Sequence, residues 1–435
     1  MSNQNIAKVA SKADILLVGK FLREQAPLCI HKENQFSASP TEPLDSGKTQ
    51  GDKLLSFSFV TPSYGVKAGA DDQSEIADRS LSGHYLQMYD WDACFFASKA
   101  EEIGAPGLAL DVVSNFLALI DEEGYIPRTV SPGRIWDAGD QCKPFLTGTY
   151  KHYIQVSKAT PDPLVLKKLA SFLSYFEKKR KSKNNLYRWR NVLESGVDDN
   201  LALIAPREAA KDEDDSFCRF IDGEIEACDL STYLAVEFQV LGELHKSTAN
   251  SDAGKVWQDK SRALTDSIET LMFNDKLSIY CNRHKDEQLE LKSWTGLAPV
   301  LFGIASKEHG RQIIENTMLN PQHFLRPCGL ASHAVSEPLA NQQRRGLYGR
   351  AIVSNWQGPM WVLPNALAVK ALLGYGYEGQ ARELASRIVK CLAESIEKHG
   401  TLYENYDAES GSPLWAPQFM SWNILALDLV HLLLH

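Results

Sequence analysis

The spacing of hydrophobic residues along the chain is mainly that of amphipathic helices. Between residues 165 and 177 apolar side chains recur at i, i+3, i+4 and i+7, while Lys167, Lys168 and Glu177 fall on the opposite face. Strand-like alternation is scarce, and 54–60 is the best candidate, in one small N-terminal hairpin. The same helical pattern predicts further helices at about 11–22, 92–103, 107–120, 146–157, 229–247, 255–272, 295–305, 308–318, 360–374, 379–397 and 417–433.

Long polar stretches containing Gly and Pro separate the predicted helices. Loops of this length are uncommon unless they serve a function. About a dozen helices, paired as hairpins with long loops gathered at one end, predict an all-α fold, an (α/α)6 toroid. Because no linker divides the sequence, residues 1–435 are expected to form a single domain. The long stretches are 31–53, 121–145, 181–228, 275–293, 319–359 and 398–416.

Charge and composition narrow the class of partner. The chain of 435 residues has 44% apolar and 23% charged residues, a net charge of −9 and a pI near 5.7. This acidic balance argues against a nucleic-acid partner and favours a small-molecule substrate. The basic run at 178–183 is interpreted as a solvated helix end. The sequence does not indicate the oligomeric state.

The cysteines and the N-terminal segment indicate the cell compartment. The eight cysteines lie at least ten residues apart, so no C-x-x-C motif exists and free, mostly buried thiols are expected. The longest apolar run near the N-terminus, at 15–18, is too short for a signal peptide core or a membrane span. We therefore expect a cytoplasmic protein without a membrane partner.

Two short stretches each offer a carboxylate in a turn-like context: 194–198, with the sequence Glu-Ser-Gly-Val-Asp, and 403–407, with Tyr-Glu-Asn-Tyr-Asp. A glycosidase needs two carboxyl groups across the scissile bond, one protonated and one ionised. Asp198 and Glu404 are the candidates, Asp198 as the acid. Taken alone, an acidic turn is more often simply solvent-exposed, although tyrosines beside Glu404 favour its burial.

Aromatic residues interleaved with polar groups suggest sugar subsites, since sugars stack on rings and donate hydrogen bonds to carboxylates. Tyr85 and Tyr89 are four residues apart and would share a helical face, followed by Trp91 and Asp92. The segment 355–361, Asn-Trp-Gln-Gly-Pro-Met-Trp, precedes a strong helix. In both places the alternative is structural: a helix cap at Asp92, and a core plug of the tryptophans.

Other catalytic templates are absent. The sequence contains no G-x-S-x-G, no H-E-x-x-H, no Walker loop and no G-x-G-x-x-G before a strand. The histidines are scattered singly, so no metal site is expected from them.

These motifs, in their order and spacing, resemble the α/α-toroid glycoside hydrolases of families 63 and 37, most closely the glucosylglycerate and mannosylglycerate hydrolases of family 63. The resemblance spans residues 85 to 422. The matching pieces are Trp91-Asp92, Gln141-Cys142-Lys143-Pro144, Glu194-Ser195-Gly196-x-Asp198, Asp229-Leu230-x-x-Tyr233-Leu234, Trp356-Gln357-Gly358-Pro359-x-Trp361, Tyr403-Glu404-Asn405-Tyr406-Asp407 and Phe419-x-Ser421-Trp422.

The resemblance implies an inverting hydrolysis with Asp198 as general acid and Glu404 as general base. In such enzymes the two carboxyl groups stand roughly 6.5–9.5 Å apart, leaving room for the attacking water. No metal or organic cofactor is implied. The −1 sugar would be lined by Trp91, Asp92, Gln141, Trp356 and Trp361, with Tyr85 and Tyr89 beside them.

The sequence also departs from the family pattern. Gln357 stands where the family commonly has an arginine before Gly-Pro, at a position expected to bind substrate. The trehalase-type R-S-Q-P-P segment is absent. A glycerate carboxylate would require an arginine fork, for which Arg219 and Arg350 are the candidates.

The predicted function is therefore an inverting, exo-acting α-glycosidase for a small α-glycoside such as glucosylglycerate or mannosylglycerate. Which sugar and which aglycone it takes is left open. The near alternative is a trehalase or another hydrolase of short α-glucosides. From other classes, a non-catalytic sugar-binding toroid and a sugar epimerase remain, although the isolated histidines offer no acid/base pair for an epimerase.

Overall fold

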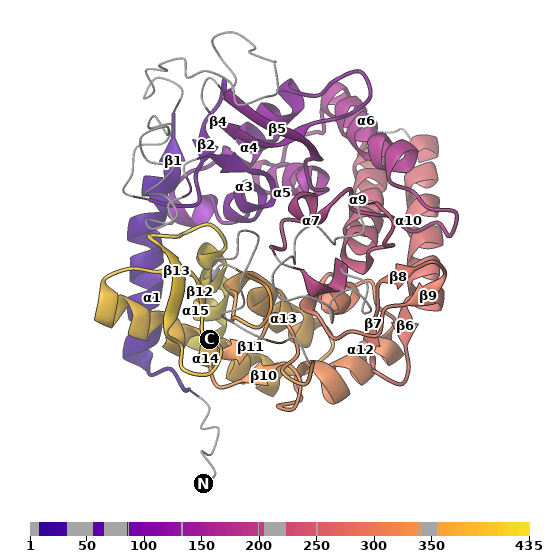
Figure 1. The fold of residues 1–435 in the computed structure, drawn as a ribbon. Coiled ribbons are helices and arrows are strands. Elements are labelled where there is room, and N and C mark those ends of the chain that lie inside the picture. Colours follow the sequence, from indigo (N-terminus) through magenta and orange to yellow (C-terminus); the bar gives the residue numbers. More distant parts are fainter. Residues whose placement is uncertain are drawn as a thin grey trace.

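The structure is a computed structural model that describes residues 8–32, 55–64, 85, 87–131, 134–198, 200–203, 223–248, 251–337, 340 and 355–435. Within this part, helices alternate along the chain between an inner ring and an outer layer (Figure 1). The inner helices are α3 (Asp90–Ala97), α5 (Leu146–Ser157), α9 (Cys228–Ser247), α11 (Ala298–Leu301), α13 (Val362–Gly374) and α15 (Ala426–Leu434). The outer helices are α1 (Lys12–Gln25), α4 (Leu108–Ala118), α6 (Pro163–Lys179), α10 (Ser251–Leu271), α12 (Lys307–Ile313) and α14 (Glu378–His399).

The inner helices close into a ring. Each packs on the next, α3 on α5, α5 on α9, α9 on α11, α11 on α13 and α13 on α15. The short 3-10 helix η7 (Trp422–Leu425), which leads into α15, packs on α3 and completes the circle. Outer helix α1 bridges α14 and α15. This arrangement confirms the predicted (α/α)6 toroid.

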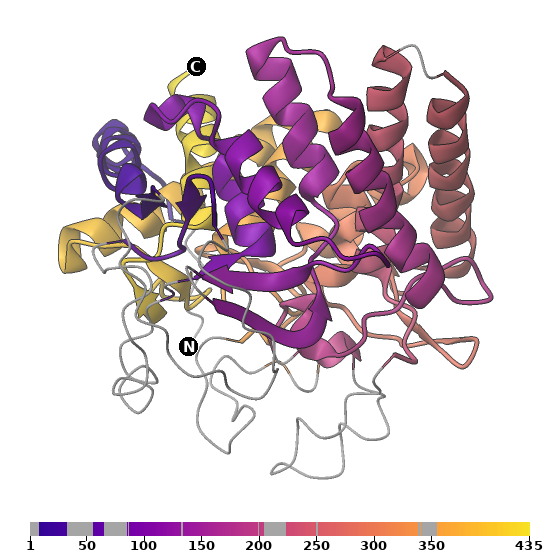
Figure 2. The same cartoon turned by 90° about the horizontal axis from the view of Figure 1, so that it is seen from above.

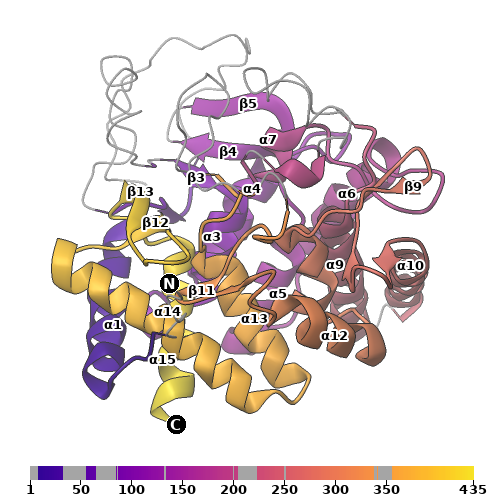
Figure 3. The ribbon, with the colours of Figure 1, turned by 60° about the horizontal axis from the view of Figure 1, so that its bottom comes forward.

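The two ends of the ring differ in what they carry. Because inner and outer helices alternate, the inner helices all begin at one end, here called the front, and finish at the other, the rear. Figure 2 shows the helices side-on, with the violet strands of the β4–β5 pair below them at the front. The short helix α7 (Val192–Ser195) also lies at this end (Figure 3). The front therefore collects the non-helical segments.

More strands form than the single hairpin that the sequence predicts. The predicted strand at 54–60 is partly present, because β2 (Phe59–Val60) pairs with β1 (Ile30–His31). A three-stranded sheet joins β3 (Met88–Tyr89), β4 (Pro127–Ser131) and β5 (Arg134–Gln141) in that order. The other antiparallel pairs are β6 (Phe273–Asn274) with β7 (Ile279–Tyr280), β8 (Arg283–His284) with β9 (Glu287–Gln288), β10 (Leu325–Arg326) with β11 (Gly329–Leu330), and β12 (Tyr403–Tyr406) with β13 (Pro413–Pro417). Apart from β5, which has eight residues, these strands have only two to five residues, too few to show a clear alternation.

Helix boundaries follow local signals where such signals exist. At the start of α6, the Asp162 side chain accepts a hydrogen bond from the backbone N–H of Leu164, and Pro163 occupies the first turn. Helix α14 ends at Gly400, whose φ of 68° lies in the left-handed region that glycine adopts without strain. The predicted helix at 417–433 is wrong in its first half, because α15 begins only at Ala426.

Seven of the eight cysteines lie in the described part of the chain, and all seven are buried free thiols, as predicted. Among the described helices, none combines the length and the hydropathy that a membrane crossing requires.

Candidate active site

The loop that carries Asp198 is fixed by a buried carboxylate. Glu194 on α7 is fully buried and accepts hydrogen bonds from the backbone N–H of Gln141, at 3.0 Å, and from the guanidinium of Arg180, at 2.7 Å. Arg180 belongs to the basic run interpreted as a solvated helix end. For this residue that interpretation is wrong, because it pairs with a buried glutamate beside the front sheet.

A fully buried ion pair lies behind this loop. The Nζ of Lys143 is 3.0 Å from a carboxylate oxygen of Asp90, and neither side chain is exposed. The same ammonium stands 4.7 Å from the ring centre of Trp91. Gly196, with φ of 67°, closes over it, and a Cβ there would lie only 2.6 Å from Nζ. Glycine is therefore required both by the backbone conformation and by the space.

Asp198 is partly buried, and its surroundings favour the protonated carboxyl. Burial raises the pKa of Asp198, while the nearby positive charges of Arg128 and Lys143 lower it in part. Arg128 lies on β4, the strand next to the one that carries Tyr89. The backbone carbonyl of Asp198 accepts a hydrogen bond from the N–H of Trp356 at 3.1 Å.

Glu404 lies on β12 and is 4% exposed. The hydroxyl of Tyr85 donates to the Glu404 carboxylate, at 3.1 and 3.2 Å from its two oxygens. The indole N–H of Trp422 donates to the Glu404 backbone carbonyl at 3.3 Å. Tyr85, which is distant in sequence, thus orients the carboxylate of Glu404, and Trp422 fixes its backbone.

Asp92 is buried in the first turn of α3, where it does not cap the helix. The hydroxyl of Ser421 donates to it at 2.7 Å. Burial raises the pKa of Asp92 to about 6, partly opposed by this hydrogen bond. Asp92 therefore contacts Ser421, which is distant in sequence, and the alternative interpretation of Asp92 as a helix cap is wrong.

The tryptophans of the predicted sugar site pack against one another. The rings of Trp356 and Trp361 are stacked with centres 4.0 Å apart, and Trp294 stacks on the other side of Trp356 at 5.0 Å. Trp91 is 6.0 Å from Trp356 and 5.9 Å from Trp422. All five are buried, so they form a rigid aromatic wall. Direct contact of Trp91, Trp356 or Trp361 with a sugar remains a prediction.

Tyr85 and Tyr89 come together, although not on a helical face as predicted. Their rings meet edge to face at 5.9 Å, but Tyr89 belongs to strand β3 and α3 begins only at Asp90. The prediction that the two tyrosines lie side by side is correct, and the prediction that they lie on a helix is wrong. A pair of neighbouring tyrosines i, i+4 does not distinguish a helix from a bent strand–helix junction.

The two glutamines have different surroundings. Gln141 is fully buried, and its amide bonds to the backbone N–H of Ile126 at 2.8 Å and the carbonyl of Gly124 at 3.3 Å. It holds the front sheet, and a sugar contact remains a prediction. Gln357 is 3% exposed in the segment beside Trp356. Arg219 and Arg350, the predicted carboxylate fork, lie outside the described residues.

Several buried polar side chains in the described part of the chain have an atom without a hydrogen-bond partner, and at the front end they include Asp229 (Oδ2), Trp294 (Nε1) and His333 (Nε2). Burial raises the pKa of Asp229 to about 6 and lowers that of His333 to about 4. Such atoms are costly unless something binds them, and sugar hydroxyls are suitable partners. Sequence reasoning did not select these residues, although Asp229 begins a recognised motif.

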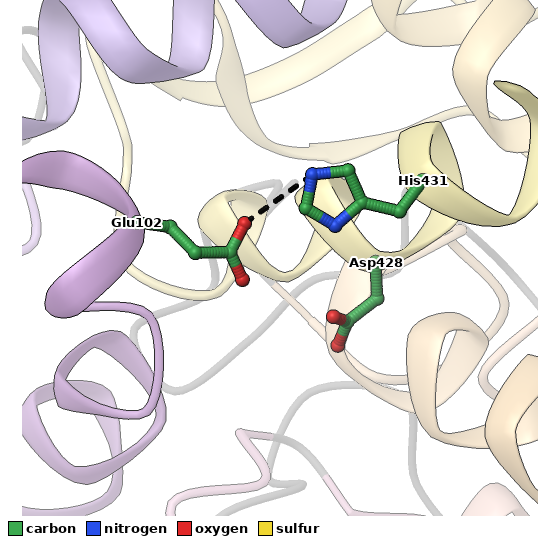
Figure 4. Close-up of side chains that lie close together, drawn as sticks. All are labelled: Glu102, Asp428 and His431. Atoms are coloured by element: carbon green, nitrogen blue, oxygen red, sulfur yellow. Dashed lines mark ion pairs between the residues drawn. The ribbon is translucent and has the colours of Figure 1, made fainter. Parts of the chain in front are cut away.

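One group of side chains has the composition of a metal site. Glu102, Asp428 and His431 lie close together, and the Glu102 carboxylate faces the imidazole of His431 at 3.5 Å (Figure 4). However, the ammonium of Lys99 already contacts both carboxylates, and Arg23 lies 2.9 Å from His431. A metal ion would compete with these cations, so the group is better explained as an ionic contact among α1, α15 and the turn after α3.

Comparisons with known proteins agree with this architecture. A GH63 mannosylglycerate hydrolase from Thermus thermophilus, solved with glucose, superimposes with a TM-score of 0.60 at 16% identity, covering 86% of this chain and 95% of that chain. The neutral trehalase Nth1 from Saccharomyces cerevisiae gives 0.59 at 16% identity, covering 80% and 72%. At such identities these likenesses concern the fold.

Sequence relatives extend the comparison. A probable mannosyl-oligosaccharide glucosidase from Schizosaccharomyces pombe is 23% identical over 271 residues, which are 56% of this chain but only 30% of that protein. Residues 85–422 match the family model described as the mannosylglycerate hydrolase MGH1-like glycoside hydrolase domain. The chain, with its toroid and its carboxylates at the front end, therefore belongs to this MGH1-like family and is a glycoside hydrolase.

Proposed function

We propose that the protein is an inverting, exo-acting α-glycosidase for a small α-glycoside such as glucosylglycerate or mannosylglycerate. Asp198 protonates the leaving oxygen, and Glu404 removes a proton from the attacking water. Water attacks the anomeric carbon from the face opposite the aglycone, so the product has inverted configuration. The reaction releases a free hexose and the free aglycone.

One observation carries the proposal, namely that residues 356–360 join the two carboxylate-bearing segments. At one end Trp356 donates its N–H to the carbonyl of Asp198. At the other end Met360 and Tyr406 exchange backbone hydrogen bonds of 2.8 and 3.0 Å, two residues beyond Glu404. Segments more than 200 residues apart in sequence are thereby fixed to one short connection, as a cooperating acid and base require.

The different surroundings of the two carboxyls support their roles. Burial raises the pKa of Asp198, which favours the protonated form that an acid needs. Glu404 instead accepts a hydrogen bond from the hydroxyl of Tyr85, a contact that orients its carboxylate for the role of a base.

For the aglycone, Arg128 adds a candidate to Arg219 and Arg350. Its positive charge acts on Asp198, next to which a leaving group must lie, and its Nε has no hydrogen-bond partner. A glycerate carboxylate would suit this guanidinium. The Thermus relative has been solved in complex with Tris and D-glycerate, which is consistent with an anionic aglycone.

The substrate test is hexose release from glucosylglycerate, mannosylglycerate, glucosylglycerol, trehalose, sucrose, kojibiose and nigerose, with the anomer followed by NMR. We expect β-hexose first, and faster turnover of a glycerate glycoside than of neutral glucosylglycerol. Initial α-hexose would overturn the acid/base assignment. Preference for trehalose would favour the trehalase alternative, and no turnover of any compound would contradict the substrate class.

The residue test pairs each catalytic variant with a matched one. Asp198→Asn and Glu404→Gln are each expected to lower kcat by about 10²–10⁴-fold, the range of general acid–base catalysis, with stability changed by no more than ~1–2 kcal/mol. Asp266→Asn and Glu397→Gln make the same chemical changes on exposed outer-helix positions and should leave kcat unchanged. Retention of most activity by either catalytic variant would refute its assignment.

A further inference from the structure

A cavity opens at the rear of the ring, and its lining does not include the proposed catalytic residues. It has a volume of about 980 Å³ and is lined from five inner helices and from α12. Its lining includes Ser98, Gly303 and Gly374, which lie at or just beyond the ends of α3, α11 and α13, and it reaches the first turns of α5 at Gly148. The proposed site residues Trp91, Asp92 and Trp361 stand instead where α3 and α13 begin. We call this cavity the rear pocket.

An aromatic plug lies between the front end and the rear pocket. Tyr233 packs between Phe145 and Phe302, with ring centres 4.8 and 5.0 Å apart. On α9, Asp229 lies one turn toward the front from Tyr233, and Glu237 lies one turn toward the rear and lines the pocket. Phe145 and Phe302 both line the rear pocket, so part of its inner wall is apolar.

Three cations surround the mouth: Lys307 and Arg311 on α12 and Lys370 on α13. All three are exposed, and none forms an ion pair or a hydrogen bond within the described chain. Lys307 is the first residue of α12. The helix dipole disfavours a positive charge at this position, so the charge of Lys307 does not stabilise α12. On a protein with a net charge of −9, this local excess of positive charge attracts an anion.

The carboxylate inside the pocket opposes an anion only weakly. Glu237 is 2% exposed and accepts hydrogen bonds of 2.7 Å from the backbone N–H groups of Thr147 and Gly148 at the start of α5. Burial raises the pKa of Glu237 to about 7, so much of it is uncharged at neutral pH. A further acid, Glu101, pairs with the lining residue His152 at 3.1 Å.

The mouth of the rear pocket is open, and a hydrogen bond fixes the segment beside it. A Cβ added at Gly303, Gly374 or Gly376 would meet no atom within 4 Å. Beside them, the hydroxyl of Tyr375 donates to the carbonyl of Ala305 at 3.0 Å. Leu373 leaves 40% of its surface in water at this mouth, an apolar surface that a ligand would cover.

We propose that the rear pocket binds a phosphorylated amphipathic molecule, with its phosphate between Lys307, Arg311 and Lys370 and its apolar part against Phe145 and Phe302. Three separate positive groups match a dianionic phosphate better than a single carboxylate. The cavity volume lies within the range of small-ligand sites. This binding is independent of the proposed hydrolysis, which uses the opposite end of the ring.

Calorimetric titration of the full chain with hexyl phosphate tests the proposal, with inorganic phosphate and 1-hexanol as separate probes. We expect saturable binding of hexyl phosphate at one site, weaker binding of inorganic phosphate, and no binding of 1-hexanol. Equal affinity for hexyl phosphate and inorganic phosphate would show that the apolar side chains of the pocket do not contribute to binding. Equal affinity for hexyl phosphate and 1-hexanol would show that the phosphate group is not recognised. Absence of hexyl phosphate binding would overturn the proposal.

Variants locate the site. The triple change Lys307→Gln, Arg311→Gln and Lys370→Gln should weaken hexyl phosphate binding roughly tenfold, from three exposed charge contacts. The control triple Lys12→Gln, Lys255→Gln and Lys398→Gln changes the net charge equally and should have little effect. These exposed outer-helix lysines form no ion pair with any described residue. Equal weakening by both would show non-specific attraction and contradict the pocket.

A filling variant provides a second test that does not depend on charge. Gly374→Phe places a ring in the open mouth and should weaken hexyl phosphate binding while leaving inorganic phosphate binding unchanged. Unchanged hexyl phosphate binding would place the ligand elsewhere. Thermal unfolding of each variant verifies the fold, and hydrolysis by the triple variant should equal that of the unmodified protein, whether or not the proposed substrate is correct.

Discussion

The front and rear ends of the same helix ring use charge in opposite ways. At the front, Asp90 and Lys143 are completely buried and paired, and they support the proposed catalytic loop. At the rear, Lys307, Arg311 and Lys370 are exposed and make no ion pair in the described chain. A buried charge must be matched by the protein itself, whereas an exposed one remains available to a ligand. The charges at the front therefore hold the fold in place, whereas those at the rear remain available to bind a ligand.

The sharpest test of this contrast is to neutralise one lysine at each end. Lys143→Met should destabilise the protein by about 3–5 kcal/mol, because it leaves Asp90 buried without its partner. Lys370→Met, with the same chemical change, should stay within about 0.5 kcal/mol. Urea unfolding measures both.

A second variant separates the ion pair from the volume of Lys143. Adding Asp90→Asn to Lys143→Met removes the unpaired charge, and much of the lost stability should return. If the double variant is no more stable than Lys143→Met alone, the buried pair does not determine the stability of the front end.

Two buried groups, His333 at the front and Glu237 at the rear, should contribute to the pH dependence of stability with opposite signs. Burial lowers the pKa of His333 at the front to about 4, so the unfolded chain binds more protons between pH 6.5 and 4, and stability is lost on acidification. Burial raises the pKa of Glu237 at the rear to about 7, so the folded chain binds more protons between pH 4.5 and 7, and stability is lost as pH rises. Each contributes a slope of at most about 1.4 kcal/mol per pH unit.

Unfolding free energies between pH 4 and 8 measure these slopes. His333→Gln should remove part of the loss on the acid side, and Glu237→Gln part of the loss as pH rises. Because each variant also changes the absolute stability, only the slopes are compared. Parallel curves for a variant and the unmodified protein would exclude that residue as a source of the pH dependence.

A smaller effect concerns Arg128 and rests on the proposed roles at the front. Its charge lowers the pKa of Asp198, so Arg128→Gln should raise that pKa and move the basic limb of kcat/KM to higher pH. Arg262→Gln changes an arginine paired with Asp259 on outer helix α10 and should leave the limb in place. A downward shift for Arg128→Gln would contradict Asp198 as the acid.

The helices were predictable from sequence, and the strands were not. A segment such as α6 contains enough apolar repeats and its own N-terminal cap, so the sequence locates it within a few residues. The β12–β13 hairpin, which carries Glu404, has strands too short to show a period. Its backbone is held by Met360, a residue more than 40 positions away, and no local pattern reports such a contact.

The sequence by itself determined the ring of helices, the family and the two candidate carboxylates, because these depend on periodicity and on motifs read in order. Only the tertiary structure showed that residues 356–360 connect the two carboxylate segments, that Lys143 pairs with Asp90, and that a plug at Tyr233 divides the interior. Each of these depends on segments distant in sequence meeting inside the ring. Such meetings are set by packing between elements, and local sequence does not specify them.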